Sequence, residues 1–339
     1  MEKTMQKIKR YIRHTLAIAF LITAISAINA AAATFTVTNT SNTGAGSLRQ
    51  AVLDSNAAAG SDTIVFDSTF NSPQTITLAS VITLNPATGD TLTITGPGAN
   101  LLTVSGNNAT RIFAVSSGDT AFISGMTLTQ AVTGALINGG NLTVTNMTFN
   151  ANTNNGGASE GGGAISGRSA LSLTVNGCAF TNNTNTAAGV NGVGGGAISN
   201  EVPATITNST FTNNSAGDGG GGAIVTYSGL LTITGSTFTG NTTTSTSQNS
   251  RGGAIALFGG GQLTINNSVL TGNSSTRDGG AIYYQPNSAA SLPFLTINNS
   301  TISNNTANSR TRDGNGTRSL KMKSAAGAGC IAVRISGVV

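Results

Sequence analysis

Histidine, cysteine and tryptophan are almost absent from this chain, and each shortage excludes a kind of chemistry. The 339 residues contain no tryptophan, one histidine, His14, and two cysteines, Cys178 and Cys330. Because His14 lies in a leader-like N-terminus, nothing after it can supply histidine for nucleophilic catalysis or a zinc site. Two distant cysteines do not make a disulfide scaffold. We expect no catalytic residue here and interpret Cys178 as a small buried filler.

Charged and aromatic side chains are also scarce, at 8% and 5% of the residues, whereas glycine occurs 45 times. A globular core needs more bulk per residue than this, but the thin interior of a stacked repeat does not. Residues 34–309 hold five arginines, no lysine and nine acidic residues, so the net charge of +5 arises at the two ends. No basic stripe with interleaved aromatics is present, and we expect no nucleic-acid partner.

Residues 1–33 have the pattern of a secretory signal peptide. Five basic residues precede an apolar run from Leu16 to Ile25, and the small residues from Ala27 to Ala33 permit cleavage. The run is shorter than the about 20 residues that a membrane span needs; a retained anchor is the alternative. We expect an exported protein, extracellular, at the cell surface or in the outer membrane, with no transmembrane helix in the mature chain.

The centre of the chain is a tandem repeat with two markers. One marker is Gly-Gly-Ala-Ile, and the other is an apolar residue followed three positions later by asparagine. The second marker recurs in steps of 31, 31, 27, 32 and 32 residues. Its apolar residues are Phe149, Phe180, Phe211, Phe238, Leu270 and Ile302, and its asparagines are Asn152, Asn183, Asn214, Asn241, Asn273 and Asn305.

Short segments between the markers alternate with period 2 and are rich in threonine and β-branched residues. In one of them, Leu231 and Ile233 point one way while Thr232 and Thr234 point the other. This pattern excludes a helical solenoid, and about 30 residues leave no room for a propeller blade. The sequence therefore predicts an all-β parallel β-helix over residues 74–309, with three short strands per coil.

In a parallel β-helix, equivalent residues of successive coils stack about 4.8 Å apart. The apolar marker residues would form one interior column, and the Leu231 and Ile233 positions two more. The six marker asparagines would form a ladder at an inner turn, where each amide donates to the next coil's carbonyl and tolerates a bent backbone. The alternative is that these asparagines only favour turns.

Residues 34–73 are predicted to cap the N-terminal end of the solenoid. Ser47 is the predicted N-cap of a helix that runs to Asn56, with Gln50 three residues later. Leu48, Ala51, Val52 and Ser55 lie along one side of it. A short amphipathic helix of this kind can cover the open apolar end of a repeat protein.

Two stretches resemble known families. The run from Gly46 to Ala51, followed by Ser55-Asn56 and Asp62–Phe66, resembles the CSLREA-type N-terminal region of exported bacterial β-helix proteins, with Gly46 replacing cysteine and Gln50 replacing glutamate. The paired markers over residues 134–305 resemble the repeats of the polymorphic outer membrane protein family, whose members are surface-displayed, adhesin-like passengers. This resemblance implies a right-handed β-helix and a cell-surface location, but no active site.

The repeat pattern ends after Asn305. Arg312-Asp313-Gly314 begins like Arg277-Asp278-Gly279, but a basic stretch with the only lysines after the leader then follows. We expect residues 310–339 to be an aberrant tail, disordered or produced by a frameshift or premature stop. A genuine basic tail is the alternative.

Sugar-cleaving enzymes also use β-helices, so the acidic residues need examination. Glu160, Asp218 and Asp278 each lie shortly before a Gly-Gly pair, and together they could form a weak calcium site or a carboxylate cluster at one corner. Their offsets differ and no strand carries them, which favours solvated loop acids. We expect no cofactor, with calcium as the one candidate.

Paired outward threonines, such as Thr143/Thr145 and Thr232/Thr234, recur in successive coils. Such a flat hydroxyl and methyl surface could order water or lie on a glycan, although threonine is also simply a good strand residue.

The sequence as a whole predicts a non-enzymatic, exported β-helix repeat protein, adhesin-like or structural. Its lateral faces would contact extracellular glycans, host surfaces or neighbouring surfaces. We expect a monomer or part of a larger surface polypeptide. The alternative is a polysaccharide-binding or polysaccharide-degrading protein with the same fold, like pectate lyases.

Overall fold

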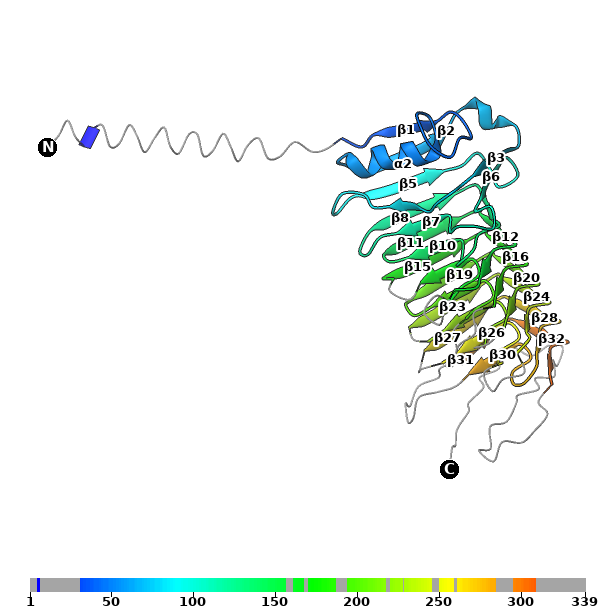
Figure 1. The fold of residues 1–339 in the computed structure, drawn as a ribbon. Helices are drawn as coiled ribbons and strands as arrows, with labels where there is room; N and C mark the ends of the chain where they lie inside the picture. Colours follow the sequence, from blue (N-terminus) through cyan, green and yellow to red (C-terminus); the bar gives the residue numbers. More distant parts are fainter. Residues whose placement is uncertain are drawn as a thin grey trace.

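The computed structural model shows a solenoid of stacked coils, with strands running side by side along its whole length (Figure 1). Every strand pairing in it is parallel, which makes the described chain a parallel β-helix, as predicted. The structure describes residues 5–6, 31–156, 161–167, 170–186, 194–217, 220–227, 229–245, 250–258, 261–284 and 295–308. The predicted tail at 310–339, and all of the predicted leader except residues 5–6 and 31–33, lie outside these ranges.

Sheet A is the widest of four sheets, and most of its strands have five residues. Its strands follow one another in chain order, one per coil. They are β1 (Thr34–Val37), β2 (Asp62–Phe66), β5 (Thr91–Thr95), β8 (Thr120–Ser124), β11 (Asn141–Thr145), β15 (Ser172–Asn176), β19 (Ala204–Thr207), β23 (Leu230–Thr234), β27 (Gln262–Asn266) and β31 (Leu295–Asn298).

Sheets B and C close the coil on the other sides, and their central strands have three residues each. Sheet B contains β3 (Gln74–Thr77), β6 (Leu102–Ser105), β9 (Thr127–Thr129), β12 (Thr148–Asn150), β16 (Ala179–Thr181), β20 (Thr210–Thr212), β24 (Thr237–Thr239), β28 (Val269–Thr271) and β32 (Thr301–Ser303). Sheet C contains β4 (Ile82–Leu84), β7 (Phe113–Val115), β10 (Leu136–Asn138), β14 (Ile165–Gly167), β18 (Ile198–Asn200), β22 (Ile224–Thr226), β26 (Ile255–Leu257) and β30 (Ile282–Tyr284).

A fourth sheet, D, was not predicted. Three strands per coil were expected, but the residues just after each ladder asparagine add a fourth strand of two residues. Two residues are too short to show a period, and this explains the omission. The strands are β13 (Thr153–Asn154), β17 (Thr184–Asn185), β21 (Ser215–Ala216), β25 (Thr242–Thr243), β29 (Ser274–Ser275) and β33 (Thr306–Ala307).

The interior is a set of residue columns, as the alternation predicts. Ile233 stacks between Ile206 and Ile265, each from a neighbouring coil. Leu231 belongs to a column with Leu142, Leu173, Leu263 and Leu295, in which Ala204 occupies the rung between Leu173 and Leu231. Alanine gave no signal as a core residue in the sequence because it is small and common.

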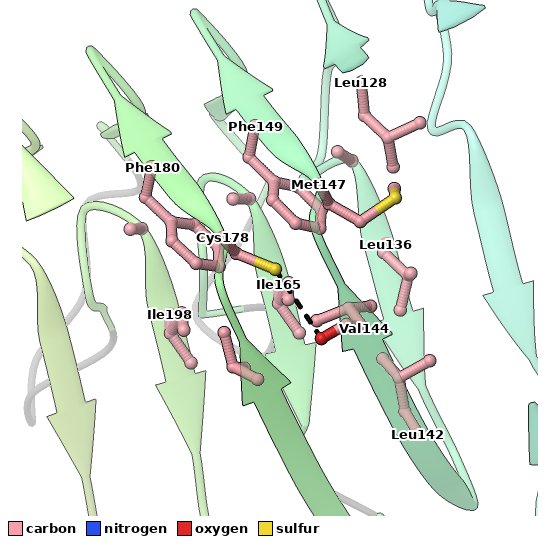
Figure 2. Packing of buried hydrophobic residues seen from close by; sticks show 14 of the residues in the cluster. Leu128, Leu136, Leu142, Val144, Met147, Phe149, Ile165, Cys178, Phe180 and Ile198 are labelled. Atoms are coloured by element: carbon pink, nitrogen blue, oxygen red, sulfur yellow. Dashed lines mark hydrogen bonds between the residues drawn. The ribbon is translucent and has the colours of Figure 1, made fainter. Parts of the chain in front are cut away.

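The third column contains the phenylalanines of the repeat marker. Phe149, Phe180, Phe211 and Phe238 are fully buried, and neighbouring ring centroids lie 4.5–4.7 Å apart with planes 0–1° from parallel. Leu270 and Ile302 continue the column in the next two coils. Figure 2 shows Phe149 and Phe180 piled over one another beside Met147, Cys178 and Val144.

The Gly-Gly-Ala-Ile marker is explained by close backbone contact at one corner of the coil. A Cβ on Gly222, the second glycine, would overlap the carbonyl oxygen of Gly253 and lie 2.5 Å from the amide nitrogen of Thr242. The first glycine of the pair also has a positive φ in three copies, for example +73° at Gly221. Both positions therefore need glycine, and this is why the marker recurs.

Helix α2 (Leu48–Ala57) lies at the N-terminal end of the solenoid, where it packs on β1, β2 and β4 (Figure 1). Its buried residues are those predicted: Leu48, Ala51, Val52 and Ser55. The Ser47 hydroxyl accepts from the Gln50 amide at 3.1 Å, but the Gln50 side chain donates to Asp54 rather than back to residue 47. The N-cap is thus present without a full capping box.

The cap is joined to the coils by hydrogen bonds and by the sheet itself. Arg49 donates to the carbonyls of Val81 and Ser80, and Asn56 donates to the carbonyl of Thr83. Strand β2 pairs with β5 of the first coil, so sheet A runs through the expected boundary at residue 73. A 3-10 helix at Ser68–Asn71 adds the buried Phe70.

Candidate functional site

The marker asparagines form a continuous hydrogen-bonded ladder inside the coil, which confirms the prediction. The side-chain nitrogen Nδ2 of Asn183 donates to the backbone carbonyl oxygen of Phe149 at 2.9 Å and to Oδ1 of Asn214 at 3.0 Å. Oδ1 of Asn183 accepts from both the side chain and the backbone amide of Asn152. The same contacts recur along the six rungs Asn152, Asn183, Asn214, Asn241, Asn273 and Asn305.

One detail of the ladder prediction is wrong. The asparagines were expected to adopt the bent backbone themselves, but positive φ occurs one residue earlier, as at Asn182 (55°) and Asn213 (54°). This earlier position is asparagine or glycine in five of the six coils, because both tolerate left-handed backbone, and Ala151 adopts it in the first coil (52°). Each ladder asparagine is thereby freed to point inward, and the first five rungs are fully buried.

A second ladder, of serines, was not predicted. In successive coils the backbone amide of one rung donates to the hydroxyl of the next, from Ser209 to Ser236 to Ser268 to Ser300, at 3.0–3.1 Å. Each hydroxyl donates in turn to the carbonyl two residues earlier in its own coil, as Ser209 does to Thr207 at 2.7 Å. These serines lie two residues before the apolar marker, at the position that Cys178 occupies in its own coil, where the sequence predicted only a small buried filler.

Cys178 occupies the rung before Ser209 and is buried, as expected. Its backbone amide donates to the Ser209 hydroxyl at 3.1 Å, and its thiol lies 3.3 Å from the Asn176 carbonyl and 3.6 Å from that of Val144 (Figure 2). Burial raises the pKa of the Cys178 thiol to about 11. The thiol is therefore protonated and unreactive at neutral pH. Cys330 lies outside the described residues.

The outer face of sheet A carries an unbroken file of threonines. Thr143, Thr174, Thr205, Thr232, Thr264 and Thr296 are register partners in six successive coils; Thr205 is exposed and the other five are half-buried. A parallel file two residues along contains Thr145, Asn176, Thr207, Thr234, Asn266 and Asn298. Phe122, 40% exposed, ends the threonine file on the N-terminal side.

The outer face of sheet C is different, because it carries a small second core. Val225, Ala256 and Tyr283 are buried there, with Tyr227 and Phe258 packed against them. The Tyr227 and Phe258 rings stack with centroids 5.6 Å apart, and the Arg251 guanidinium lies 4.8 Å above the Tyr283 ring. The Tyr227 and Phe258 rings are stacked, the Tyr283 ring is tilted by 48° from that of Phe258, and these contacts stabilise the corner.

The proposed calcium or carboxylate site is only partly visible. Glu160 and Asp218 lie outside the described residues, while Asp278 is half-buried and its backbone pairs with Arg251. Over the part of the chain that the structure describes, no three His, Cys, Asp or Glu side chains gather as metal ligands would. Asp278 stands beside Arg277 at the Gly-Gly corner.

The geometry defines a parallel β-helix built on two internal polar ladders. The model of the right-handed beta helix region family matches residues 172–323, which gives the coils their hand. The chain is thus a right-handed parallel β-helix with about 30 residues per coil. No curated protein matches the chain.

Among solved structures, the chain is similar to ORF18 of Geobacillus virus E2. The two are 14% identical, with a TM-score of 0.36, and the match covers 85% of this chain. The chain spans 64% of the length of that viral protein, which is less than two thirds. A likeness at this level adds nothing to the fold assignment. Among the described helices, none has the length and apolarity to cross a membrane.

Proposed function

We propose that the chain is an exported, non-enzymatic β-helix that acts at the cell surface as an adhesin-like or structural rod. The observation that carries this proposal is the regular outer surface of sheet A, where the same uncharged side chains recur in register in six successive coils. A surface of this kind binds through many weak, equivalent contacts rather than through one pocket.

Export is supported by the composition of the leader and by how the rod is stabilised. The basic and apolar segments of residues 1–33 match a signal peptide. The buried Asn and Ser ladders hold successive coils together by hydrogen bonds in neighbouring turns. The one cysteine in the described part of the rod, Cys178, is free and buried, so the packing there does not use a disulfide and does not depend on the redox state outside the cell.

Two measurements test this function. The full-length chain, produced in a bacterial host and recovered from outside the cytoplasm, should begin after the leader, between Ala27 and Thr34; recovery from the cytoplasm with Met1 intact would overturn export. The fluorescently labelled protein should bind cell surfaces or immobilised glycans. Unlabelled protein should compete for the same sites, so the apparent affinity of the labelled protein should fall as unlabelled protein is added.

The polysaccharide-degrading alternative is tested with the same protein. Incubation with acidic and neutral polysaccharides, with and without calcium, should release no new reducing ends and no unsaturated products. Release of either would replace the non-enzymatic proposal, and loss of that activity in Asp278→Asn would then assign Asp278 to it. The matched control is Asp67→Asn, since Asp67 lies in the N-terminal cap and caps the 3-10 helix.

A further inference from the structure

The outer face of sheet A repeats in register from coil to coil, with a threonine at the same position in six successive strands. In this solenoid the phenylalanine planes of four successive coils are parallel within 0–1°, at centroid spacings of 4.5–4.7 Å. Successive rings are therefore not tilted against one another, and the register of sheet A places the outward threonines from Thr143 to Thr296 one strand spacing apart from coil to coil, so that they form a regular lattice.

The outer face of sheet A is uncharged and carries three files of outward residues. The threonines from Thr143 to Thr296 form the middle file, and their hydroxyls are free to bind a ligand. On β11, β15, β19, β23 and β27 the outward residues are Asn141, Thr143, Thr145, Ser172, Thr174, Asn176, Thr205, Thr207, Leu230, Thr232, Thr234, Gln262, Thr264 and Asn266. Among the described residues, no protein group hydrogen-bonds to the hydroxyls of the six middle-file threonines. Side-file members bond to one another instead, as Thr207 does to Asn176 at 2.9 Å.

We propose that this threonine face binds the surface of ice. A threonine hydroxyl can both donate and accept, as water does, and the methyl group beside it orders the surrounding water. A single contact of this type is weak, so the ligand must repeat at the interval of the coils. Hexagonal ice repeats along one axis at nearly the 4.5–4.7 Å interval of the phenylalanine stack.

A crystalline polysaccharide fits this face less well. The sugar units of cellulose and chitin repeat at a longer interval along their chains than the coils do. The described outward positions on β11 to β31 also lack the aromatic and charged side chains that usually hold a sugar ring. The inference deepens the proposed function and rests on its lateral-face binding, because it names the ligand of one face, but it does not depend on where the protein is anchored.

The test compares two double variants of the full-length chain. Thr232→Tyr with Thr264→Tyr places bulk in the middle file of sheet A. The matched control, Thr212→Tyr with Thr239→Tyr, makes the same change in adjacent coils on the outer face of sheet B, whose other outward file is broken by Ala179 and Val269. The readouts are inhibition of ice recrystallisation and uptake of fluorescent protein into growing ice.

The wild type and the sheet B variant should inhibit recrystallisation at concentrations within about twofold of each other. The sheet A variant should need at least about tenfold more protein, because the contiguous file is interrupted at its centre. If tyrosine lowers the unfolding midpoint, Thr232→Val with Thr264→Val replaces it, since valine has the same branched shape and exchanges only each hydroxyl for a methyl group.

Three results would overturn the assignment: no effect of the wild type on ice, equal losses in the two variants, or wild-type binding to microcrystalline cellulose or chitin without binding to ice. Each can be told apart from a failure of the proposed function, because cell-surface binding and cleavage of the leader are measured on the same preparations.

Discussion

Removing one middle rung of the asparagine ladder is the perturbation whose cost can be worked out most completely. In Asn183→Ala, four hydrogen bonds are lost: two donated by the Asn183 side chain, to Phe149 and Asn214, and two accepted from Asn152. The backbone amide of Asn183 keeps its bond to Asn214. At a net value of about 1 kcal/mol for each bond, the variant should be destabilised by about 4 kcal/mol.

The loss of stability in Asn183→Ala should also be local, and hydrogen exchange at one backbone amide should report it. The backbone N–H of Asn152, which bonds to Oδ1 of Asn183 at 3.2 Å, is left without a partner inside the coil. Its hydrogen exchange should accelerate by up to about a thousandfold, the equivalent of about 4 kcal/mol. Amides several coils away should change little, since each coil contacts only its neighbours.

Asn150→Ala is the matched control, because Asn150 lies one coil from the target, on the outer face of β12. Its denaturant midpoint should shift by less than the equivalent of about 0.5 kcal/mol. If Asn183→Ala behaved like Asn150→Ala in both denaturation and exchange, the ladder would not stabilise the rod, and the marker asparagines would have to be read as turn formers only.

Three further changes test other parts of the interior. Gly222→Ala should destabilise by about 2–4 kcal/mol in thermal or chemical unfolding, because its Cβ would overlap the Gly253 carbonyl; an unchanged midpoint would refute the close approach at that corner. Phe211→Ala should cost about 3–5 kcal/mol and Phe211→Leu much less, since leucine already fills this column at Leu270; equal losses would contradict the column. Burial raises the pKa of the Cys178 thiol to about 11, above its unfolded value of 9.0, so its contribution is full below pH 9 and is lost as the pH rises toward 11. Wild-type stability should therefore fall over that window more steeply than that of Cys178→Ser, and parallel curves would argue against the shift.

The repeat itself was readable from the sequence because its key positions accept few residues. In every copy an asparagine follows the apolar marker by three residues, and two glycines mark a tight corner. This constant spacing can be recognised even in a sequence rich in Asn, Ser, Thr and Gly. The same spacing located the interior columns and the ladder. The N-terminal cap was readable for another reason, since Ser47 and the buried side of α2 follow ordinary helix rules.

What was missed has physical reasons as well. The serine ladder is interrupted by Cys178 and preceded by Met147, so its members looked like unrelated small residues. Sheet D has strands of two residues, which carry no periodicity. The left-handed bend falls at Asn182, one residue before the ladder, so the sequence pattern of the ladder asparagines themselves did not locate it.

The measurement that tests the account most directly is the distance between two outer threonines five coils apart. Spin labels on Thr143→Cys and Thr296→Cys, in a Cys178→Ser background to remove the buried thiol and with Cys330 also replaced by serine, report this separation by pulsed electron paramagnetic resonance. Coils stacked by translation predict a single narrow distribution near about 24 Å, five strand spacings, widened only by the label linkers. A broad or much longer distribution would contradict the in-register stacking on which the ladders, the threonine face and the proposed binding all depend.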